Sequence, residues 1–348
     1  MIPPLLAGLA LPGVDELLEG AVVVAQPMHT RFRGTTVREA MLLRGPAGWA
    51  EFSPFPEYGA TESSRWLAAA IEAGWHGWPA PVRESVPVNA TVPAVRPADV
   101  GRVLEAYGAV PAVKVKVAEQ GQGVDDDVAR VAEVRRLLPD AAVRIDANQG
   151  WDHDTALAAL GRLAGYGLEY AEQPVAGIEG LARLREALVR AGIDLKLAAD
   201  ESVRKETDPV AVARAGAADL VVVKVQPLGG VRRALGIVQA AGLDAVVSSA
   251  LDTSVGIAAG VALAASLPRL PHACGLGTVA LFAQDVAVPS WTPDAGRLRP
   301  GPAPVPDPAA LGALRVAEDR RQWWCSRLRA AHGILARQLE TGDSAPSA

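Results

Sequence analysis

The chain has 348 residues, of which 50% are hydrophobic and 21% are charged, so it can build one large barrel or two domains. Its formal net charge of −5 argues against nucleic acid as the main partner. Two cysteines, Cys274 and Cys325, are too few for a disulfide framework and favour a reducing cytoplasm.

Residues 1–87 predict an α+β segment. The run MIPPLLAGLA has a pair of prolines and no basic residue before its apolar stretch, so we do not expect a signal peptide. Antiparallel strands are expected at 21–30, 35–45 and 48–59, with RGPAG as the turn between the last two. The stretch TESSRWLAAAIEAGW predicts a helix whose N-cap is Thr61.

From residue 88 onward, short β-branched runs alternate with Ala- and Leu-rich helical patterns. The expected strands are VNATVPAV (88–95), AVKVKV (112–117), AVRIDAN (142–148), LEYAEQP (168–174), LKLAADE (195–201), DLVVVKV (219–225), DAVVSSA (244–250) and HACGLGT (272–278). Helices expected between them include 127–138 and 178–192, the latter closed by Gly192. This rhythm predicts a (β/α)₈ barrel. A doubly wound sheet is the alternative, but it usually carries a Gly-rich phosphate loop, which we do not find.

The C-terminal third predicts helices and a connector. The run VGIAAGVALAAS (255–266) is shorter than a membrane span and favours a buried helix, so no membrane partner is expected. A Pro-rich connector at 292–308 precedes a last helix at 309–339. The end of the chain, 341–348, predicts a disordered tail.

Carboxylates stand at the ends of three successive expected strands, at Asp146, Glu172 and Asp200. Barrel strands are parallel and about 4.8 Å apart, so their ends meet at one rim, where such barrels carry their active sites. Like charges gathered there raise one another's pKa unless a cation lies between them. Carboxylate oxygens suit a hard divalent ion, so the pattern predicts Mg²⁺, with Mn²⁺ as an alternative.

Lysines flank these carboxylates on both sides. Lys114 and Lys116 share one face of the second strand, and Lys224 ends the sixth. A lysine near a metal and other cations can have its pKa lowered towards neutrality, as a general base requires. One charge at a strand end is usually solvated or salt-bridged, but six in register across five consecutive strands favour a catalytic site.

Five stretches carry a resemblance to a known family. They are KVKV (114–117), RIDANQGW (144–151), EQPV (172–175), AADES (198–202) and VVVKVQPLGG (221–230). With them, the chain resembles the enolase superfamily, within its muconate-lactonising subgroup, and is most similar to the o-succinylbenzoate synthase family of menaquinone biosynthesis. The seventh strand has no histidine, which argues against the mandelate-racemase-like subgroup.

The resemblance implies an enolase-type division of the chain. Residues 1–87, completed by 291–340, would form an α+β capping domain on a barrel of residues 88–290. The stretch GWAEFSPFPEYG resembles a cap loop that closes over substrate. Phe55 and Tyr58 in this loop either line the lid or pack inside the cap.

The resemblance also implies a role for each charged residue. Asp146, Glu172 and Asp200 would bind the metal. Lys116 would be the base, with Lys224 across the site and Lys114 tuning Lys116. Arg144, Asn148 and Glu201 would support these residues from outside the first layer of metal ligands. The implied reaction is the dehydration of 2-succinyl-6-hydroxy-2,4-cyclohexadiene-1-carboxylate to o-succinylbenzoate. It begins with removal of a proton next to a carboxylate, continues through a metal-stabilised enediolate, and ends with loss of hydroxide.

Further residues have weaker patterns. Ser248 and Ser249 end the seventh strand and Gly275 follows in the eighth, where they would hold substrate carboxylates, although ordinary turns have the same composition. His153 follows Asp152, the expected N-cap of a helix, so we assign His153 no chemistry.

Three other functions remain open at this point. An N-acylamino acid racemase or dipeptide epimerase would use Lys116 and Lys224 on opposite faces of the substrate. A Schiff-base aldolase would use the sixth-strand lysine as a nucleophile. A barrel kept only as a binding scaffold is hard to reconcile with a full set of acids and bases. Each enzymatic reading has a small carboxylate or carbonyl substrate, and the oligomeric state is left open, with a monomer plausible.

Overall fold

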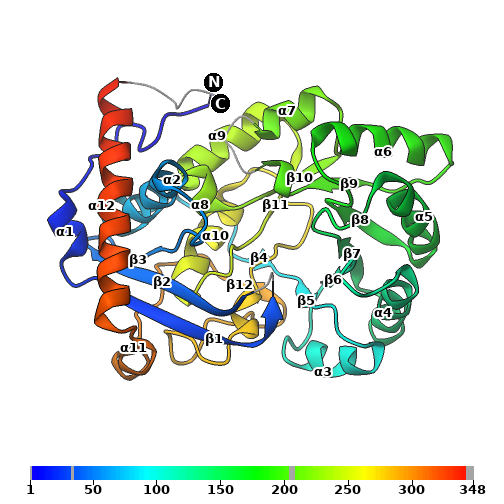
Figure 1. The fold of residues 1–348 in the computed structure, drawn as a ribbon, viewed down its shortest axis with the longest axis horizontal. Coiled ribbons are helices and arrows are strands. Elements are labelled where there is room, and N and C mark those ends of the chain that lie inside the picture. Colours follow the sequence, from blue (N-terminus) through cyan, green and yellow to red (C-terminus); the bar gives the residue numbers. More distant parts are fainter. Residues whose placement is uncertain (1, 33–34, 204–207, 342–348) are drawn as a thin grey trace.

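The computed structural model describes residues 2–32, 35–203 and 208–341, which form a parallel barrel with a smaller antiparallel sheet at its flank (Figure 1). The smaller sheet has the order β1-β2-β3, formed by β1 (Val22–Phe32), β2 (Thr35–Gly45) and β3 (Gly48–Phe52). The turn between β2 and β3 lies at the predicted RGPAG, where Gly45 pairs with Gly48. The antiparallel N-terminal strands are therefore confirmed, but the third ends at Phe52 instead of continuing to residue 59.

The barrel contains seven parallel strands in chain order. They are β5 (Ala90–Val92), β6 (Ala112–Lys116), β7 (Ala142–Asp146), β8 (Leu168–Glu172), β9 (Leu197–Ala199), β10 (Leu220–Val223) and β11 (Asp244–Val247). Two isolated parallel bridges, Val88 to Cys274 and Ser248 to Gly275, join the first and last of these strands through residues 274–275. The barrel prediction is confirmed, but the expected eighth strand at 272–278 is reduced to these bridges.

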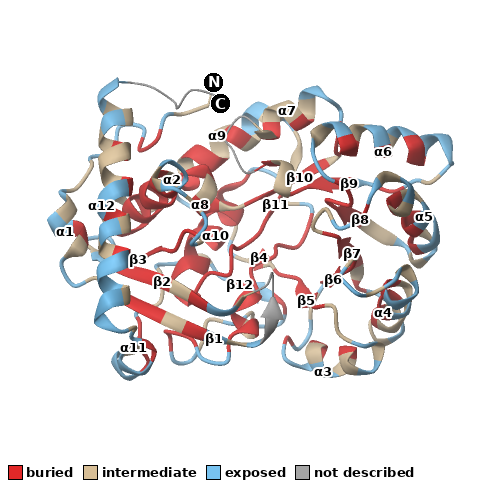
Figure 2. Ribbon diagram, in the orientation of Figure 1, coloured by how far each residue is buried: buried red, intermediate tan, exposed pale blue. Residues whose placement is uncertain are grey.

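Helices surround the barrel and cover its outer face. They are α3 (Val100–Glu105), α4 (Val124–Leu137), α5 (His153–Leu163), α6 (Ile178–Arg190), α7 (Asp208–Arg214), α8 (Val225–Leu228), α9 (Val231–Ala241) and α10 (Ser254–Ser266). Asp152 caps α5 by accepting a hydrogen bond from the Thr155 amide at 2.8 Å, as predicted. Every residue of α10 is buried, as its apolar composition indicates (Figure 2). Among the described helices, none has both the length and the apolar composition to cross a membrane.

Both ends of the chain pack together beside the antiparallel sheet. The remaining elements are α1 (Val14–Leu18), α2 (Ala60–Ile71), β4 (Val86–Pro87), β12 (Arg297–Leu298), α11 (Pro308–Leu314) and α12 (Glu318–Thr341). Phe52 of β3, Trp66 of α2 and Trp324 of α12 belong to one hydrophobic cluster. We propose that 1–87 and 291–340 form one capping unit on a barrel of 88–290. The tail predicted at 341–348 lies, from residue 342 on, outside the described residues.

Two helix predictions were wrong in detail. Helix α2 begins at Ala60 with Gly59 as its N-cap, so Thr61 lies inside the first turn. The single helix expected at 309–339 is two helices, because residues 315–316 are extended and pair with the edge strand β1. Arg315 bridges Val24, and the Val316 amide donates to the Val23 carbonyl at 3.1 Å.

Alternation along the barrel strands separates apolar from charged side chains. On β6, Val113 and Val115 pack outward into the cluster under the helices, whereas Lys114 and Lys116 lie on the opposite face, inside the barrel. Deeper in the barrel, the floor is a separate apolar cluster of Tyr170, Ala198, Leu220, Val222 and Val246. The charged side chains therefore lie above an apolar floor, at the carboxyl ends of the strands.

Glu72 anchors the antiparallel layer to the barrel. This buried carboxylate accepts hydrogen bonds from the Val231 amide at 2.5 Å and the Arg232 side chain at 2.7 Å, at the N-terminus of α9. Gly230 permits this approach, because its φ is +116° and a Cβ there would lie 2.2 Å from the Glu72 Oε2. The loop after β10 is thereby tied to α2.

Glu51 forms a second junction and gives the protein a pH-dependent stability. Burial, followed by the charge of Asp252, raises the pKa of Glu51 from 4.5 to about 7. The folded state then binds more protons than the unfolded state, so this stabilisation is complete below the unfolded pKa and is lost as the pH rises through about 7. We expect the unfolding free energy to fall by up to about 3 kcal/mol from this source between pH 4.5 and pH 8.

Urea unfolding at several pH values measures this effect. Glu51→Gln should flatten the dependence relative to the wild type, whereas Glu62→Gln, at an exposed position on α2, should leave it unchanged. Equal slopes for the wild type and Glu51→Gln would contradict the assignment.

Candidate active site

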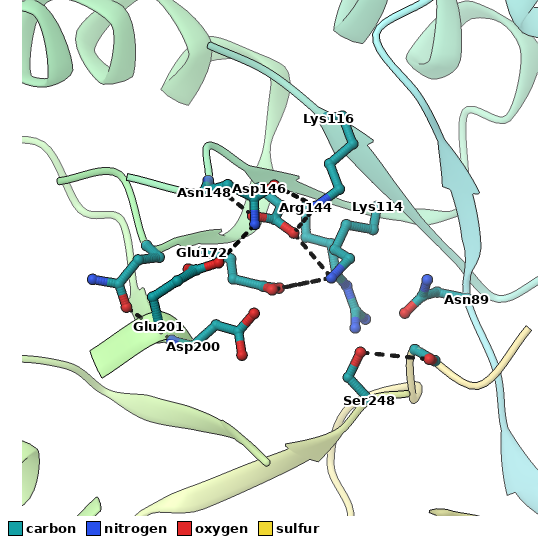
Figure 3. Close-up of polar contacts among 12 residues, drawn as sticks. Asn89, Lys114, Lys116, Arg144, Asp146, Asn148, Glu172, Asp200, Glu201 and Ser248 are labelled. Atoms are coloured by element: carbon teal, nitrogen blue, oxygen red, sulfur yellow. Dashed lines mark hydrogen bonds and ion pairs between the residues drawn. The ribbon is translucent and has the colours of Figure 1, made fainter. Parts of the chain in front are cut away.

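Strand register brings the predicted charges to one end of the barrel, with Lys116, Asp146 and Glu172 level and Asp200 two residues further along. Lys116 pairs with Asp146, Asp146 with Glu172, and Glu172 with Ala198, two residues before Asp200. Asp146, Glu172 and Asp200 are at most 5% exposed. Figure 3 draws these carboxylates in one cluster with the two lysines of β6. The acids predicted from the strand ends therefore do lie together.

Each carboxylate of the cluster contacts a lysine, and Figure 3 shows this for Asp146 and Glu172. Lys114 Nζ lies 3.0 Å from Glu172 Oε1 and 3.2 Å from Asp146 Oδ2. Lys116 Nζ lies 2.5 Å from Asp146 Oδ2, and Lys224 forms an ion pair with Asp200. Each of the three acids thus has a lysine partner, in a group of Lys114, Lys116, Asp146 and Glu172 and in the pair of Lys224 and Asp200.

The electrostatic consequences differ between the partners. Burial, followed by the charge of Asp146, raises the pKa of Glu172 to about 8, while Lys114 opposes the shift. Burial alone would lower the pKa of Lys114, but the charges of Glu172 and Asp146 outweigh it and raise that pKa above its usual range. Lys114 therefore stays protonated beside these acids, and the lowering of a lysine pKa beside a metal ion stays a prediction.

Asn148 links Lys116 to the next strand. Its Oδ1 accepts a hydrogen bond from Lys116 Nζ at 2.6 Å, and its Nδ2 donates to Glu201 Oε1 at 2.9 Å. The Asn148 backbone is left-handed, with φ of 45°, which asparagine tolerates better than most residues. Its amide also donates to Asp146 Oδ1 at 3.1 Å, so the turn orients acid and lysine together.

Arg144 lies deeper in the barrel than the carboxylate cluster. This fully buried side chain donates hydrogen bonds to the Tyr170 hydroxyl at 3.0 Å, the Ala273 carbonyl at 2.7 Å and Glu169 Oε2 at 2.5 Å. His272 also contacts Glu169, at 2.6 Å. Arg144 therefore ties β7 and β8 to the last barrel segment beneath the site.

A pocket opens above the charge cluster. It is lined by Phe55, Thr91, Lys114, Lys116, Asp200, Lys224, Ser248, Ser249, Ala250, Leu251, Gly275 and Thr278. Three of the five lysines of the chain are among these residues. The predicted substrate contacts Ser248, Ser249 and Gly275 line the same pocket. Phe55 also lines it, whereas Tyr58 packs on Phe55 with ring centroids 5.9 Å apart.

Two lysines face each other across this pocket. In the closed ring of seven strands and the 274–275 segment, β6 and β10 are four positions apart in either direction. Lys116 ends β6 and Lys224 follows β10, so they occupy opposite walls. A substrate between them can exchange protons on either face.

Family models match both parts of the chain. A model described as "Enolase C-terminal domain-like" matches residues 97–309, and one described as "Enolase N-terminal domain-like" matches residues 23–74. The chain belongs to the enolase superfamily. Members of this superfamily generally use a divalent metal, usually Mg²⁺.

Curated relatives named o-succinylbenzoate synthase match nearly the whole chain. The relative from Mycolicibacterium smegmatis is 52% identical over 326 residues, covering 93% of this chain and 99% of its own length. That from Mycobacterium marinum is 51% identical over 338 residues, covering 96% and 100%. That from Mycobacterium tuberculosis is 50% identical over 326 residues, covering 93% and 97%.

Solved structures support the fold. The muconate lactonizing enzyme from Pseudomonas fluorescens aligns with a TM-score of 0.73 at 20% identity, covering 85% of this chain and 98% of that one. The N-succinyl Arg/Lys racemase from Bacillus cereus aligns with a TM-score of 0.69 at 21% identity, covering 85% and 97%. These likenesses establish an enolase-type barrel with its cap.

The carboxylate cluster suits a divalent cation chemically. In the described part of the chain, no three His, Cys, Asp or Glu side chains already converge as a metal site. The acids instead turn towards lysines, which supply the positive charge. Burial, followed by the charge of Asp146, raises the pKa of Glu172, and the three buried carboxylates at the strand ends form the oxygen donor set that Mg²⁺ prefers.

Two contributors were not predicted from the sequence. Gln173 is fully buried, and its Oε1 accepts hydrogen bonds from the amides of Asp200 at 2.9 Å and Ser202 at 3.1 Å. Its backbone is left-handed, with φ of 39°, so the alternation of side chains along a strand does not predict where Gln173 points. The one available indication in the sequence was its position directly after Glu172. Thr91 lines the pocket and pairs with Lys114, and the alternation in VNATV was the available signal.

The contact between Asn148 and Lys116 can be tested by mutation. Asn148→Ala should lower kcat by about 10- to 100-fold with little change in KM, because Lys116 loses the side-chain oxygen that accepts its hydrogen bond and orients it. Steady-state kinetics measures the two constants separately. Gln149→Ala is a matched control, since Gln149 is also left-handed with φ of 66° and its replacement carries similar backbone strain. Equal losses in the two variants would assign the effect to the backbone instead.

Proposed function

We propose that this chain is an o-succinylbenzoate synthase, a carbon–oxygen lyase that dehydrates 2-succinyl-6-hydroxy-2,4-cyclohexadiene-1-carboxylate to o-succinylbenzoate in menaquinone biosynthesis. The observation that carries the proposal is the pocket with Lys116 and Lys224 on opposite walls above three carboxylates. Identities of 50–52% to relatives of that name, over nearly their whole length, support the same activity.

Asp146, Glu172 and Asp200 would hold a divalent cation, Mg²⁺ or Mn²⁺, which supplies positive charge to the substrate carboxylate when bound. Lys116 takes the proton from the carbon next to that carboxylate, and the electron pair left behind forms the ring double bond as hydroxide departs. Protonated Lys116 can return its proton to the leaving hydroxide, so the balance is loss of one water. Lys224 stays charged on the opposite wall and stabilises the developing negative charge.

The remaining wall suits the second carboxylate of the substrate. Ser248, Ser249 and Thr278 present hydroxyl groups, and Ser249 and Thr278 are joined at 2.6 Å. The hydroxyl groups can donate hydrogen bonds to a carboxylate, and Gly275 lets it come close to the backbone, without adding another negative charge. The partner we propose is therefore a small dicarboxylate. Both cysteines are free, in keeping with a cytoplasmic enzyme.

Opposed lysines also fit a racemase, so the test compares two assays. We expect purified protein with Mg²⁺ to form the aromatic product, followed by absorbance, with a kcat/KM well above that for racemisation of N-succinylamino acids, followed by chiral separation. Lys224→Ala should weaken dehydration without removing proton abstraction at Lys116. Dominant racemisation, with exchange from one substrate face lost in Lys224→Ala, would overturn the proposal.

A further inference from the structure

Arg38 is a buried cation that joins the antiparallel sheet to the wall of the pocket. It lies on β2, is 2% exposed, and reaches residues more than 200 positions away in the sequence. Its Nε donates to the Leu251 carbonyl at 3.2 Å, and its Nη2 donates to the Ala250 carbonyl at 3.3 Å. Ala250 and Leu251 both line the pocket, directly after Ser249.

The same guanidinium holds the cap side of the pocket. Its Nη2 also donates to the Ser53 carbonyl and, at 3.2 Å, to the Ser53 hydroxyl. Its central carbon lies 4.2 Å from the centroid of the Phe55 ring. One planar group therefore contacts Phe55, Ala250 and Leu251, and these three residues are the apolar part of the pocket lining.

Buried acids keep this arginine in place. Glu51 accepts hydrogen bonds from the Ser53 hydroxyl at 2.6 Å and from the Thr253 hydroxyl at 2.6 Å, and Asp252 accepts one from the Ala250 amide at 3.2 Å. Both carboxylates interact electrostatically with Arg38. The loop 250–253 is thus bound to the cap by a buried network of charges.

The backbone at Leu251 requires such support. Its φ is +59°, in the left-handed region that a branched non-glycine residue rarely adopts. Such a conformation costs on the order of 1 kcal/mol and persists where surrounding contacts determine it. The hydrogen bond from Arg38 to the Leu251 carbonyl is one of those contacts.

We propose that Arg38 is a positioning residue that braces the apolar wall of Phe55, Ala250 and Leu251 against the hydrocarbon part of the substrate, and so sets substrate fit without touching the reacting atoms. This inference rests on the proposed function for the identity of the substrate. Ala250 and Leu251 follow β11, which lies opposite β7 and its Asp146 in the ring of strands, so we expect bracing to affect binding more than proton transfer.

Arg38→Lys tests the brace, because lysine keeps the charge but cannot span Ser53, Phe55 and Leu251 with one flat group. We expect KM for dehydration to rise about tenfold while kcat changes less than about threefold. Phe55→Leu should raise KM similarly. The double variant should be little worse than the poorer single variant, because both changes disturb one wall.

Hydrogen exchange supplies a measurement that does not need substrate. Amide exchange of residues 250–253 should become faster in Arg38→Lys and stay unchanged in the control Arg44→Lys. Arg44 lies on the same strand, is exposed, and stacks over the Trp49 ring at 6.0 Å. Arg44→Lys should also keep the wild-type KM.

The outcomes separate the brace from the proposed function. If the wild type forms no aromatic product, the proposed function is wrong. Amide hydrogen exchange at residues 250–253 would still show whether Arg38 holds the wall in place. An active wild type with unchanged KM and exchange in Arg38→Lys overturns the brace. If Arg38→Lys does not fold, Phe55→Leu decides, because it leaves every charge in place. A wild-type KM in Phe55→Leu would contradict the proposal that this apolar wall sets substrate fit.

Discussion

Replacing Lys116 with alanine is expected to lower kcat for dehydration by about 10²- to 10⁴-fold, the usual contribution of a positioned general base. The Lys116 Nζ lies between Asp146 and Asn148 at the pocket surface, on the wall opposite Lys224. Lys114 lies one strand position deeper on the same face of β6 and forms ion pairs with Glu172 and Asp146, so we do not expect it to replace Lys116. The loss should therefore appear at every pH between 6 and 9.

The fold should survive this substitution. Asp146 keeps an ion pair with Lys114 at 3.2 Å, so no buried carboxylate loses its last cation. Circular dichroism and thermal unfolding check the fold, and absorbance of the aromatic product gives kcat. Lys196→Ala is the matched control, since Lys196 is exposed on the same barrel and should keep wild-type turnover. More than a tenth of the wild-type kcat in Lys116→Ala would require another base.

The chemistry-bearing residues could be predicted because they follow local rules. A charge at the end of an apolar strand is visible in the sequence, and the parallel barrel brings strand ends to one rim. Lys114, Asp146 and Glu172 were found in this way, and their register was then fixed by strand pairing. The alternation of side-chain direction along β6 was enough to assign Val113 and Val115 to the apolar face and Lys114 to the opposite face.

Other features depend on contacts between distant segments. The hydrogen bond from Arg38 to Leu251 spans 213 positions, and nothing near Arg38 in the sequence indicates its partner. The break after α11 occurs because Arg315 pairs with β1, a tertiary contact that overrides helix propensity. The raised pKa of Lys114 likewise depends on Glu172 and Asp146, which lie on other strands and contact it directly.

Chelation of divalent cations is expected to abolish dehydration, and added Mg²⁺ should restore it. Mg²⁺ should also stabilise the fold, by about 2.7 kcal/mol when its free concentration is 100 times the Kd. The physical reason is the buried acid cluster, in which burial, followed by the charge of Asp146, raises the pKa of Glu172 to about 8. A dication placed among the acids removes the repulsion between them and frees the lysines for substrate.

Glu172→Gln separates this metal effect from general ion effects. The amide replaces one buried carboxyl group, and Lys114 retains its ion pair with Asp146 at 3.2 Å, so stability without metal should change little. The Mg²⁺-induced rise in melting temperature should shrink, and turnover should fall with it. Glu179→Gln, at an exposed position on α6, should retain both. If Glu172→Gln kept the full thermal shift with Mg²⁺, the ion would bind elsewhere, and the three carboxylates would serve only as partners of the lysines.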